Sequence, residues 1–169
     1  MLLKDRITND MTALGAQGYM FLGYNLKYGH KGYGTLSGVN ENQIMEMPVD
    51  ENLMAGVACG LAMVGHKVCL VFERHDFLCH AMDQIVNHID KMRDMSNGEF
   101  KLKLIIRAIV GSKEPLNPGE QHTGDYTKAL NALVKMPIHV NGVFNNVRYG
   151  ELSTPCIVVE RRVDYGNSY

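Results

Sequence analysis

The sequence predicts one three-layer α/β/α domain with a mostly parallel central sheet. Short unbroken apolar runs, such as residues 68–72, are typical of strands that are covered on both faces. Longer segments between these runs repeat apolar residues at helical spacing, and such alternation is the pattern of layered α/β domains. The chain has 169 residues and no linker, internal repeat or low-complexity tract, which favours a single domain with its own core.

Composition excludes several classes of function. The net charge is −1, which argues against a nucleic-acid-binding protein with a basic face. No apolar run approaches the ~20 residues needed to span a bilayer, and the charged N-terminus lacks a signal-peptide core. The four cysteines form no CxxC pair and are interpreted as reduced core residues. We therefore expect a cytoplasmic protein that binds neither membrane nor nucleic acid.

The first third of the chain predicts a helix, a strand, a long loop and a second strand. The helix is amphipathic and is ended by Gly15 and Gly18, and the strands cover residues 19–22 and 43–47. The loop 23–38 is rich in glycine and tyrosine but matches neither GxGxxG nor GxxxxGK. We interpret it as a surface or interface loop whose tyrosines and His30 could face a ligand or partner.

An acidic turn and a helix of small residues follow. Asp50 is a good N-cap, Pro48 lies just outside the helix, and Gly65 suits the left-handed position after its end. Because residues 55–62 are small and mostly apolar, we expect a helix buried on all sides. Glu51 opens this helix and has two interpretations. A dry environment would raise its pKa, whereas an ordinary first-turn glutamate is solvated and favoured by the helix dipole.

The segment 76–95 predicts a second long helix with an apolar stripe. Its polar residues His80, Asp83 and His88 have the wrong spacing for one metal site. Strand 102–110, helix 126–134 and strands 137–140 and 156–160 complete the domain. The loop 111–123 ends in Gln121-His122, where α/β folds place ligands. His122 could be a general acid or base, or an exposed loop histidine.

The central stretch resembles the pyrimidine-binding domain of the transketolase superfamily, and most closely the N-terminal domain of 2-oxoacid dehydrogenase E1 β subunits. The family shows a Pro-Ile-Ser-Glu turn, a Gly/Ala-rich helix, a strand, an aromatic turn and an Ala-x-Asp-Gln-x-x-Asn helix leading to Lys-x-x-x-Met-Ser-x-Gly. The residues that match are Pro48, Val49, Asp50, Glu51, Gly65, Phe77, Ala81, Asp83, Gln84, Asn87, Lys91, Met95, Ser96 and Gly98. Looser matches are Gln121-His122-Thr123 and the late Glu160, Arg162, Tyr165 and Gly166.

The resemblance implies a thiamine diphosphate-binding fold and a role for Glu51. The matching glutamate of the family hydrogen-bonds N1′ of the aminopyrimidine, which helps the cofactor lose its thiazolium C2 proton. Phe77 matches an aromatic residue packed on the pyrimidine, and His122 matches a histidine that reaches the reaction centre. Glu73 and His75 lie on the same turn as further cofactor contacts, although they replace apolar or aromatic family residues. Gln121 and His30 are candidate substrate contacts.

Departures from the family imply a separate partner. The family's diphosphate and metal motif, Gly-Asp-Gly followed by Asn-Asn, is absent. Gly124-Asp125-Tyr126 opens a helix instead of closing a strand, and Asn145-Asn146 follows no such motif. We expect no metal site here, with Mg²⁺ and diphosphate held mainly by an α-like partner in an α2β2 heterotetramer. The C-terminal domain of the family's β subunits is also expected to be absent.

These observations predict the pyrimidine-binding subunit of a split enzyme, active only with its partner. The expected reaction cleaves a C–C bond next to a carbonyl of a small keto substrate and transfers a two-carbon aldehyde or ketol unit, as in transketolase. One alternative is the β-like half of a 2-oxoacid decarboxylase or dehydrogenase E1. The other is a non-catalytic cofactor-domain subunit with a structural or binding role. The sequence identifies neither donor nor acceptor.

Overall fold

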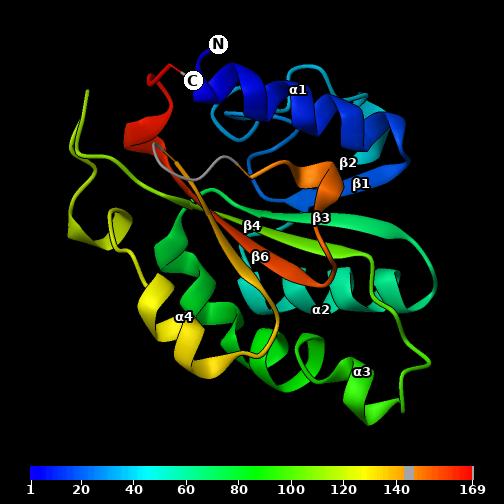
Figure 1. Ribbon diagram of the computed structural model, residues 1–169. Coiled ribbons are helices and arrows are strands. Elements are labelled where there is room, and N and C mark those ends of the chain that lie inside the picture. Colours follow the sequence, from blue (N-terminus) through cyan, green and yellow to red (C-terminus); the bar gives the residue numbers. More distant parts are fainter. Residues whose placement is uncertain (143–146, 169) are drawn as a thin grey trace.

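A computed structural model describes residues 1–142 and 147–168, and within this part of the chain a six-stranded sheet forms the centre (Figure 1). The strand order is β2-β1-β3-β4-β6-β5, and each neighbouring pair is parallel. The strands are β1 (Tyr19–Gly23), β2 (Ile44–Glu46), β3 (Lys67–Phe72), β4 (Leu104–Val110), β5 (Ile138–Asn141) and β6 (Cys156–Arg161). The prediction of an α/β fold with a mostly parallel sheet is therefore confirmed.

Helices cover both faces of the sheet (Figure 1). α1 lies on one face, and α2 lies on the other with α3 and α4 beyond it. The α-helices are α1 (Leu3–Ala16), α2 (Glu51–Met63), α3 (Met92–Met95) and α4 (Thr127–Leu133). The shorter 3-10 and π turns are η1 (Glu41–Gln43), η2 (His75–Ala81), η3 (Gln84–Ile89), η4 (Glu120–His122), η5 (Tyr149–Glu151) and η6 (Arg162–Asp164).

The core consists of two apolar clusters, one on each face of the sheet. Successive strand residues point to opposite faces, so Leu70 and Ile106 pack toward α2, whereas Val71 and Ile105 pack toward α1. All seven residues of β4 are buried, as expected of a central parallel strand. One of them is Arg107, whose charged side chain is fully buried on the face of the sheet that α1 covers.

Helix α2 begins and ends as the sequence predicts, but it is not buried on all sides. The Asp50 carboxylate accepts a hydrogen bond from Leu53 N at 2.9 Å, and Gly65 has φ +95° after the helix. Leu53 is 45% exposed, and Asn52 and Gly60 are exposed as well. The small residues therefore cover one buried face against the sheet and leave the other face open.

The predicted helix 76–95 is a helical segment of mixed geometry. It consists of the 3-10 helix η2, the π-helix η3 and a single α turn, α3. Leu78, Ile85 and Ile89 are buried, so the predicted apolar stripe is correct although the regular α-helix is not. Helix α1 also continues through Gly15 to Ala16. In the described residues, no helix is long and apolar enough to cross a membrane.

Candidate active site at the carboxyl edge of the sheet

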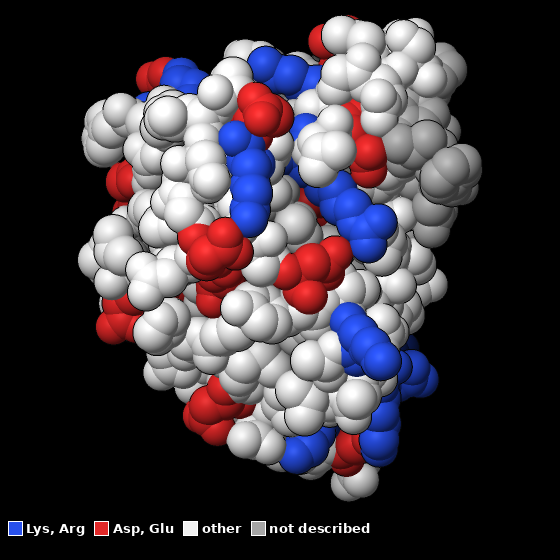
Figure 2. Space-filling model, turned by 90° about the vertical axis from the view of Figure 1, so that its left-hand side faces the viewer, with Lys and Arg blue, Asp and Glu red and all other residues white. Residues whose placement is uncertain are grey.

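The candidate site residues gather where the parallel strands end. The loop after β1, the turn after β3 and the loop after β4 all leave the sheet at this edge, and α2 begins there. Ligands of open parallel sheets bind outside the carboxyl ends of the strands. Figure 2 faces this edge and shows acidic and basic side chains interspersed across its middle, with neither sign forming a continuous patch.

Glu51 is the first residue of α2 and is only 8% exposed. The side chain is therefore buried, which does not fit the interpretation of a solvated first-turn glutamate. The phenol of Tyr24 lies close enough to Glu51 for the charge of Glu51 to affect the pKa of the phenol. Burial, then the charges of Glu73 and Glu51, raise the pKa of Tyr24 well above its usual value. The tyrosine therefore stays protonated beside Glu51.

Three rings form an aromatic wall, and one of them is Tyr24, whose pKa the Glu51 charge affects. The centroids of Tyr24 and Phe77 are 6.2 Å apart, and those of Phe77 and His122 are 5.5 Å apart in an edge-on arrangement. The loop after β4 can bring His122 this close because of Gly111. A Cβ atom at position 111 would lie 1.9 Å from the His122 carbonyl oxygen, so a larger residue would displace the histidine.

A cavity of about 320 Å³ opens beside the Phe77 and His122 rings. Its lining is partly polar and consists of Asp76, Phe77, His80, Gln121, His122 and Tyr126. Two buried lining atoms, His122 Nδ1 and Asp76 Oδ2, have no hydrogen-bond partner among the described residues. Buried polar atoms are normally paired, so this cavity suits a ligand that carries its own donors and acceptors.

His75 supplies a third unpaired polar atom near the cavity. Its side chain is fully buried and lies edge-on to Tyr126, whose backbone N–H donates to His75 Nδ1 at 3.4 Å. Burial lowers the pKa of His75, against the opposing charges of Asp125 and Asp76. A neutral imidazole that accepts at Nδ1 carries its proton on Nε2, and Nε2 has no partner in the described structure.

Glu73 holds the glycine- and tyrosine-rich loop. Its carboxylate is 5% exposed and accepts hydrogen bonds from Asn25 Nδ2 and from the backbone N–H of Gly32, both at 3.0 Å. Burial raises its pKa, and these two hydrogen bonds oppose the shift. This engagement favours a role in fixing the loop over direct contact with a cofactor.

The other residues predicted to contact a substrate are His30 and Gln121. His30 is exposed, lies 2.9 Å from Asn25 through Nδ1, and stacks on Tyr33 with centroids 6.4 Å apart. Gln121 is exposed at the rim of the cavity. The Asn145-Asn146 pair lies outside the described residues. Where the structure describes the chain, no group of three His, Cys, Asp or Glu side chains could hold a metal ion.

Comparison with known proteins finds a solved structure of the same fold and relatives of similar sequence. No protein-family model matches the chain. A solved structure described as a split gene transketolase, inactive β4 tetramer, superposes with a TM-score of 0.71, covering 100% of this chain and 53% of that chain at 17% identity. The chain therefore shares the fold of this split transketolase.

Sequence relatives agree with this assignment. The chain is 26% identical over 142 residues to the pyruvate dehydrogenase E1 component subunit β of Saccharomyces cerevisiae mitochondria, covering 80% of the chain and 38% of that protein. It is 24% identical over 144 residues to the corresponding subunit of Rickettsia conorii, covering 80% and 43%. The resemblance to E1 β subunits is confirmed, and the chain spans about two-fifths of the length of these relatives.

Sequence reasoning assigned no role to Arg74 and did not indicate that Arg74 and Arg162 meet at Tyr33. Arg74 and Arg162 both lie against the ring of Tyr33, with guanidinium carbons 5.4 Å and 4.4 Å from the ring centroid. The loop tyrosines were expected to face a ligand only as a group. The sequence signal for Arg74 was a charged residue two positions after the end of the apolar strand β3.

Proposed function

We propose that this chain is the pyrimidine-binding subunit of a split thiamine diphosphate-dependent enzyme. The observation that carries the proposal is the burial of Glu51 at the start of α2, on the same edge as Phe77 and His122. A carboxyl group beside an aromatic wall and unpaired polar atoms fits an aminopyrimidine, which is flat and has both donors and acceptors.

Each of these side chains has a distinct task in the proposal. Thiamine diphosphate, when bound, supplies an acidic thiazolium carbon and a sink for the electrons of a broken C–C bond. Glu51 holds a proton at N1′ of the aminopyrimidine, and burial keeps water from competing for that proton. Phe77 packs on the pyrimidine ring, and Tyr24 extends this wall toward Glu51. His122 lines the cavity beside this wall and would contact a substrate oxygen there.

A partner subunit completes the site in this proposal. The described residues supply a carboxyl group, rings and imidazoles but no metal cluster, so an α-like partner would hold the diphosphate and Mg²⁺. The names of the similar proteins support this division, because the relatives are β subunits and the structural neighbour is a split transketolase that is inactive as a β4 tetramer. We infer an α2β2 assembly that is active only when both halves are present.

A second cavity favours a transketolase-like substrate. Its volume is about 640 Å³, and Lys4, Arg162 and Ser112 line it with a single carboxylate, Glu114. Ser112 follows Gly111, which contacts His122, so this cavity adjoins the site. Two cations and a hydroxyl suit the phosphate of a ketose phosphate donor. The alternative, a 2-oxoacid decarboxylase half, is favoured by the E1 β names of the relatives.

The test is donor turnover by the complex purified through a tag on this chain. Ketose phosphates and 2-oxoacids are offered as donors, with and without thiamine diphosphate. We expect cofactor-dependent turnover of ketose phosphates that Glu51→Gln abolishes. The matched control is Asp50→Asn, which neutralises the adjacent exposed carboxylate and keeps a good N-cap. Turnover of 2-oxoacids alone would support the E1-like alternative. Cofactor binding without turnover of any donor would indicate a non-catalytic subunit.

A further inference from the structure

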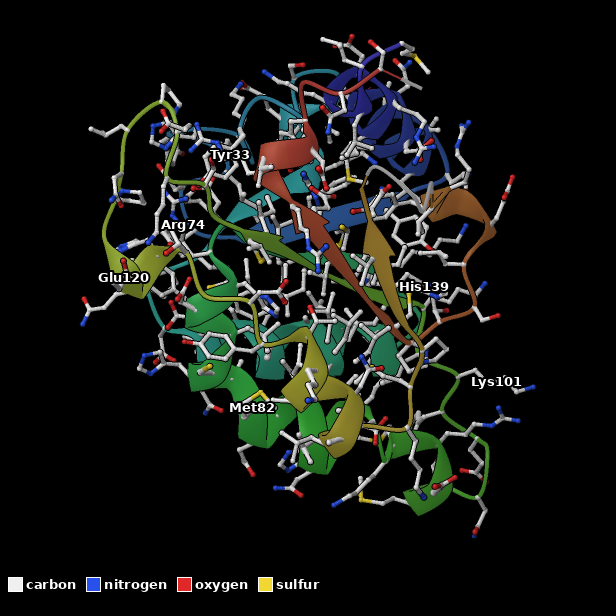
Figure 3. The ribbon with its side chains drawn as sticks, turned by 60° about the vertical axis from the view of Figure 1, so that its left-hand side comes forward. Tyr33, Arg74, Met82, Lys101, Glu120 and His139 are labelled. Carbon is white, nitrogen blue, oxygen red and sulfur yellow. The ribbon has the colours of Figure 1, made fainter. Side chains whose placement is uncertain are left out.

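A small cleft lies at the amino edge of the sheet, where β4 and β6 begin. Leu102 precedes β4 and Pro155 precedes β6, and these strands are neighbours in the sheet. The cleft has a volume of about 210 Å³ and is lined by Ile89, Arg93, Phe100, Lys101, Leu102, Thr154 and Pro155. The seven residues of β4, about 23 Å at ~3.3 Å per residue, separate it from the carboxyl edge. Figure 3 shows Lys101 on the side of the molecule away from Arg74 and Glu120.

The floor of this cleft reaches the hydrophobic core. Ile89 and Leu102 are 1% and 2% exposed and belong to the core cluster on the α2 face, and Phe100 packs against that cluster. Because residues this deeply buried still line the cleft, an apolar group that enters it contacts the core directly. Ile89 is also the last residue of the π-helix η3, a geometry that is frequent at functional sites. The floor therefore suits the apolar body of a ligand.

Two cations on the rim of the cleft have no counter-ion in the part of the chain that the structure describes. Arg93 and Lys101 are exposed, and neither side chain forms an ion pair or a hydrogen bond with a described residue. Of the acidic residues next to them in the sequence, Asp94 pairs with Lys135 at 3.5 Å, and Glu99 does not line the cleft. Because both cations are exposed and line the cleft, an anion that enters it reaches them without any change in the fold.

We propose that this cleft binds a small carboxylate with an apolar body, such as an aromatic acid. The apolar body covers the floor, and the carboxylate lies at the rim with Arg93, Lys101 and the Thr154 hydroxyl, which makes no hydrogen bond to the described residues. A phosphate dianion is disfavoured, because its second charge is costly beside an apolar floor. The volume is below the ~300 Å³ of a typical ligand pocket, so the ligand has roughly ten non-hydrogen atoms. No residue of the candidate active site takes part, so the inference is independent of the proposed function.

The test titrates phenylacetate into the 169-residue chain and follows the backbone amide signals by two-dimensional NMR. The signals of Arg93, Lys101 and Thr154 should shift together and reach saturation. Phenylacetamide has the same shape without the charge, and acetate has the charge without the ring, so both should bind at least about tenfold more weakly. Equal affinity for phenylacetate and phenylacetamide, shifts confined to other residues, or no saturable binding would overturn the proposal.

Variants of the rim test the two cations. Arg93→Gln and Lys101→Gln should each weaken phenylacetate binding about fivefold, the upper range for an exposed ion pair, and the double variant should weaken it further. Lys128→Gln is the matched control, because Lys128 is also exposed but lines a different cleft, beside Asp125 and Asn131. It should bind like the wild type. Thermal unfolding verifies that each variant is folded. Wild-type affinity in the double variant, or equal weakening in Lys128→Gln, would overturn the proposal.

Discussion

Arg107 and Glu160 form a buried ion pair, and breaking it tests how strongly this pair stabilises the fold that carries the site. Both side chains are fully buried, and they form a bidentate pair with distances of 2.6 Å from Nε to Oε1 and 2.8 Å from NH2 to Oε2. The hydroxyls of Tyr149 and Tyr165 also donate to the carboxylate. Tyr165 lines the larger cavity, so this network links the centre of the sheet to the segment that carries Arg162.

The pKa values of the residues in this network depend on the charges of both Arg107 and Glu160. Burial alone would lower the pKa of Arg107, but the Glu160 charge raises it well above its usual value. Burial and the Glu160 charge also raise the pKa values of Tyr149 and Tyr165. Removing one member of such a pair leaves an uncompensated buried charge, which typically costs about 3–5 kcal/mol. Arg107→Met should therefore lower the free energy of unfolding by about 4 kcal/mol, a large part of the roughly 5–15 kcal/mol of a typical domain.

Urea denaturation followed by circular dichroism measures this change. The double variant Arg107→Met/Glu160→Leu should be more stable than Arg107→Met alone, because no unpaired charge remains. The control is the exposed pair of Lys113 and Glu120, 2.7 Å apart, where Lys113→Met should cost less than about 1 kcal/mol. A loss below about 1 kcal/mol in Arg107→Met, or a double variant no more stable than the single one, would refute the reasoning.

Two further predictions concern the loop and pH. Glu73→Gln should lower the free energy of unfolding by about 1–2 kcal/mol, because an amide has one oxygen and can replace only one of the two hydrogen bonds from Asn25 Nδ2 and Gly32 N. An unchanged urea midpoint would contradict this expectation. Burial depresses the folded pKa of His75 below its ordinary 6.5, so the unfolded chain takes up this proton first and stability falls as pH drops below about 6.5. The fall between pH 7 and 5.5 should be shallower in His75→Gln, and equal slopes would exclude His75 as its cause.

The strands and the start of α2 could be predicted because their signals are local. The apolar run 68–72 differs from β3 by one residue, and Asp50 caps α2 as its type and position predict. The spacing of Leu78, Ile85 and Ile89 likewise identified a buried helical stripe. The π-helix η3 within that stripe could not be predicted, since i→i+5 geometry depends on how the segment packs and not on its periodicity.

The site was only partly predictable from the sequence. Resemblance identified Glu51, Phe77 and His122, and the structure places all three at one edge of the sheet. The partners of Glu73 and Arg107 could not be read from the sequence. Glu73 pairs with residues 41 and 48 positions away, and Arg107 with Glu160, 53 positions away. Such contacts arise from strand order and register, which local patterns do not encode.

The most direct test of the proposed role of Glu51 is the exchange of the C2 proton of bound thiamine diphosphate for deuterium, followed by NMR after acid quenching. The sample is the complex purified through a tag on this chain. If Glu51 holds a proton at the aminopyrimidine, Glu51→Gln should slow exchange at least about 100-fold, the scale of general acid–base catalysis, while Asp50→Asn exchanges like the wild type. Equal exchange rates in the wild type and Glu51→Gln, with cofactor bound in both, would contradict the account.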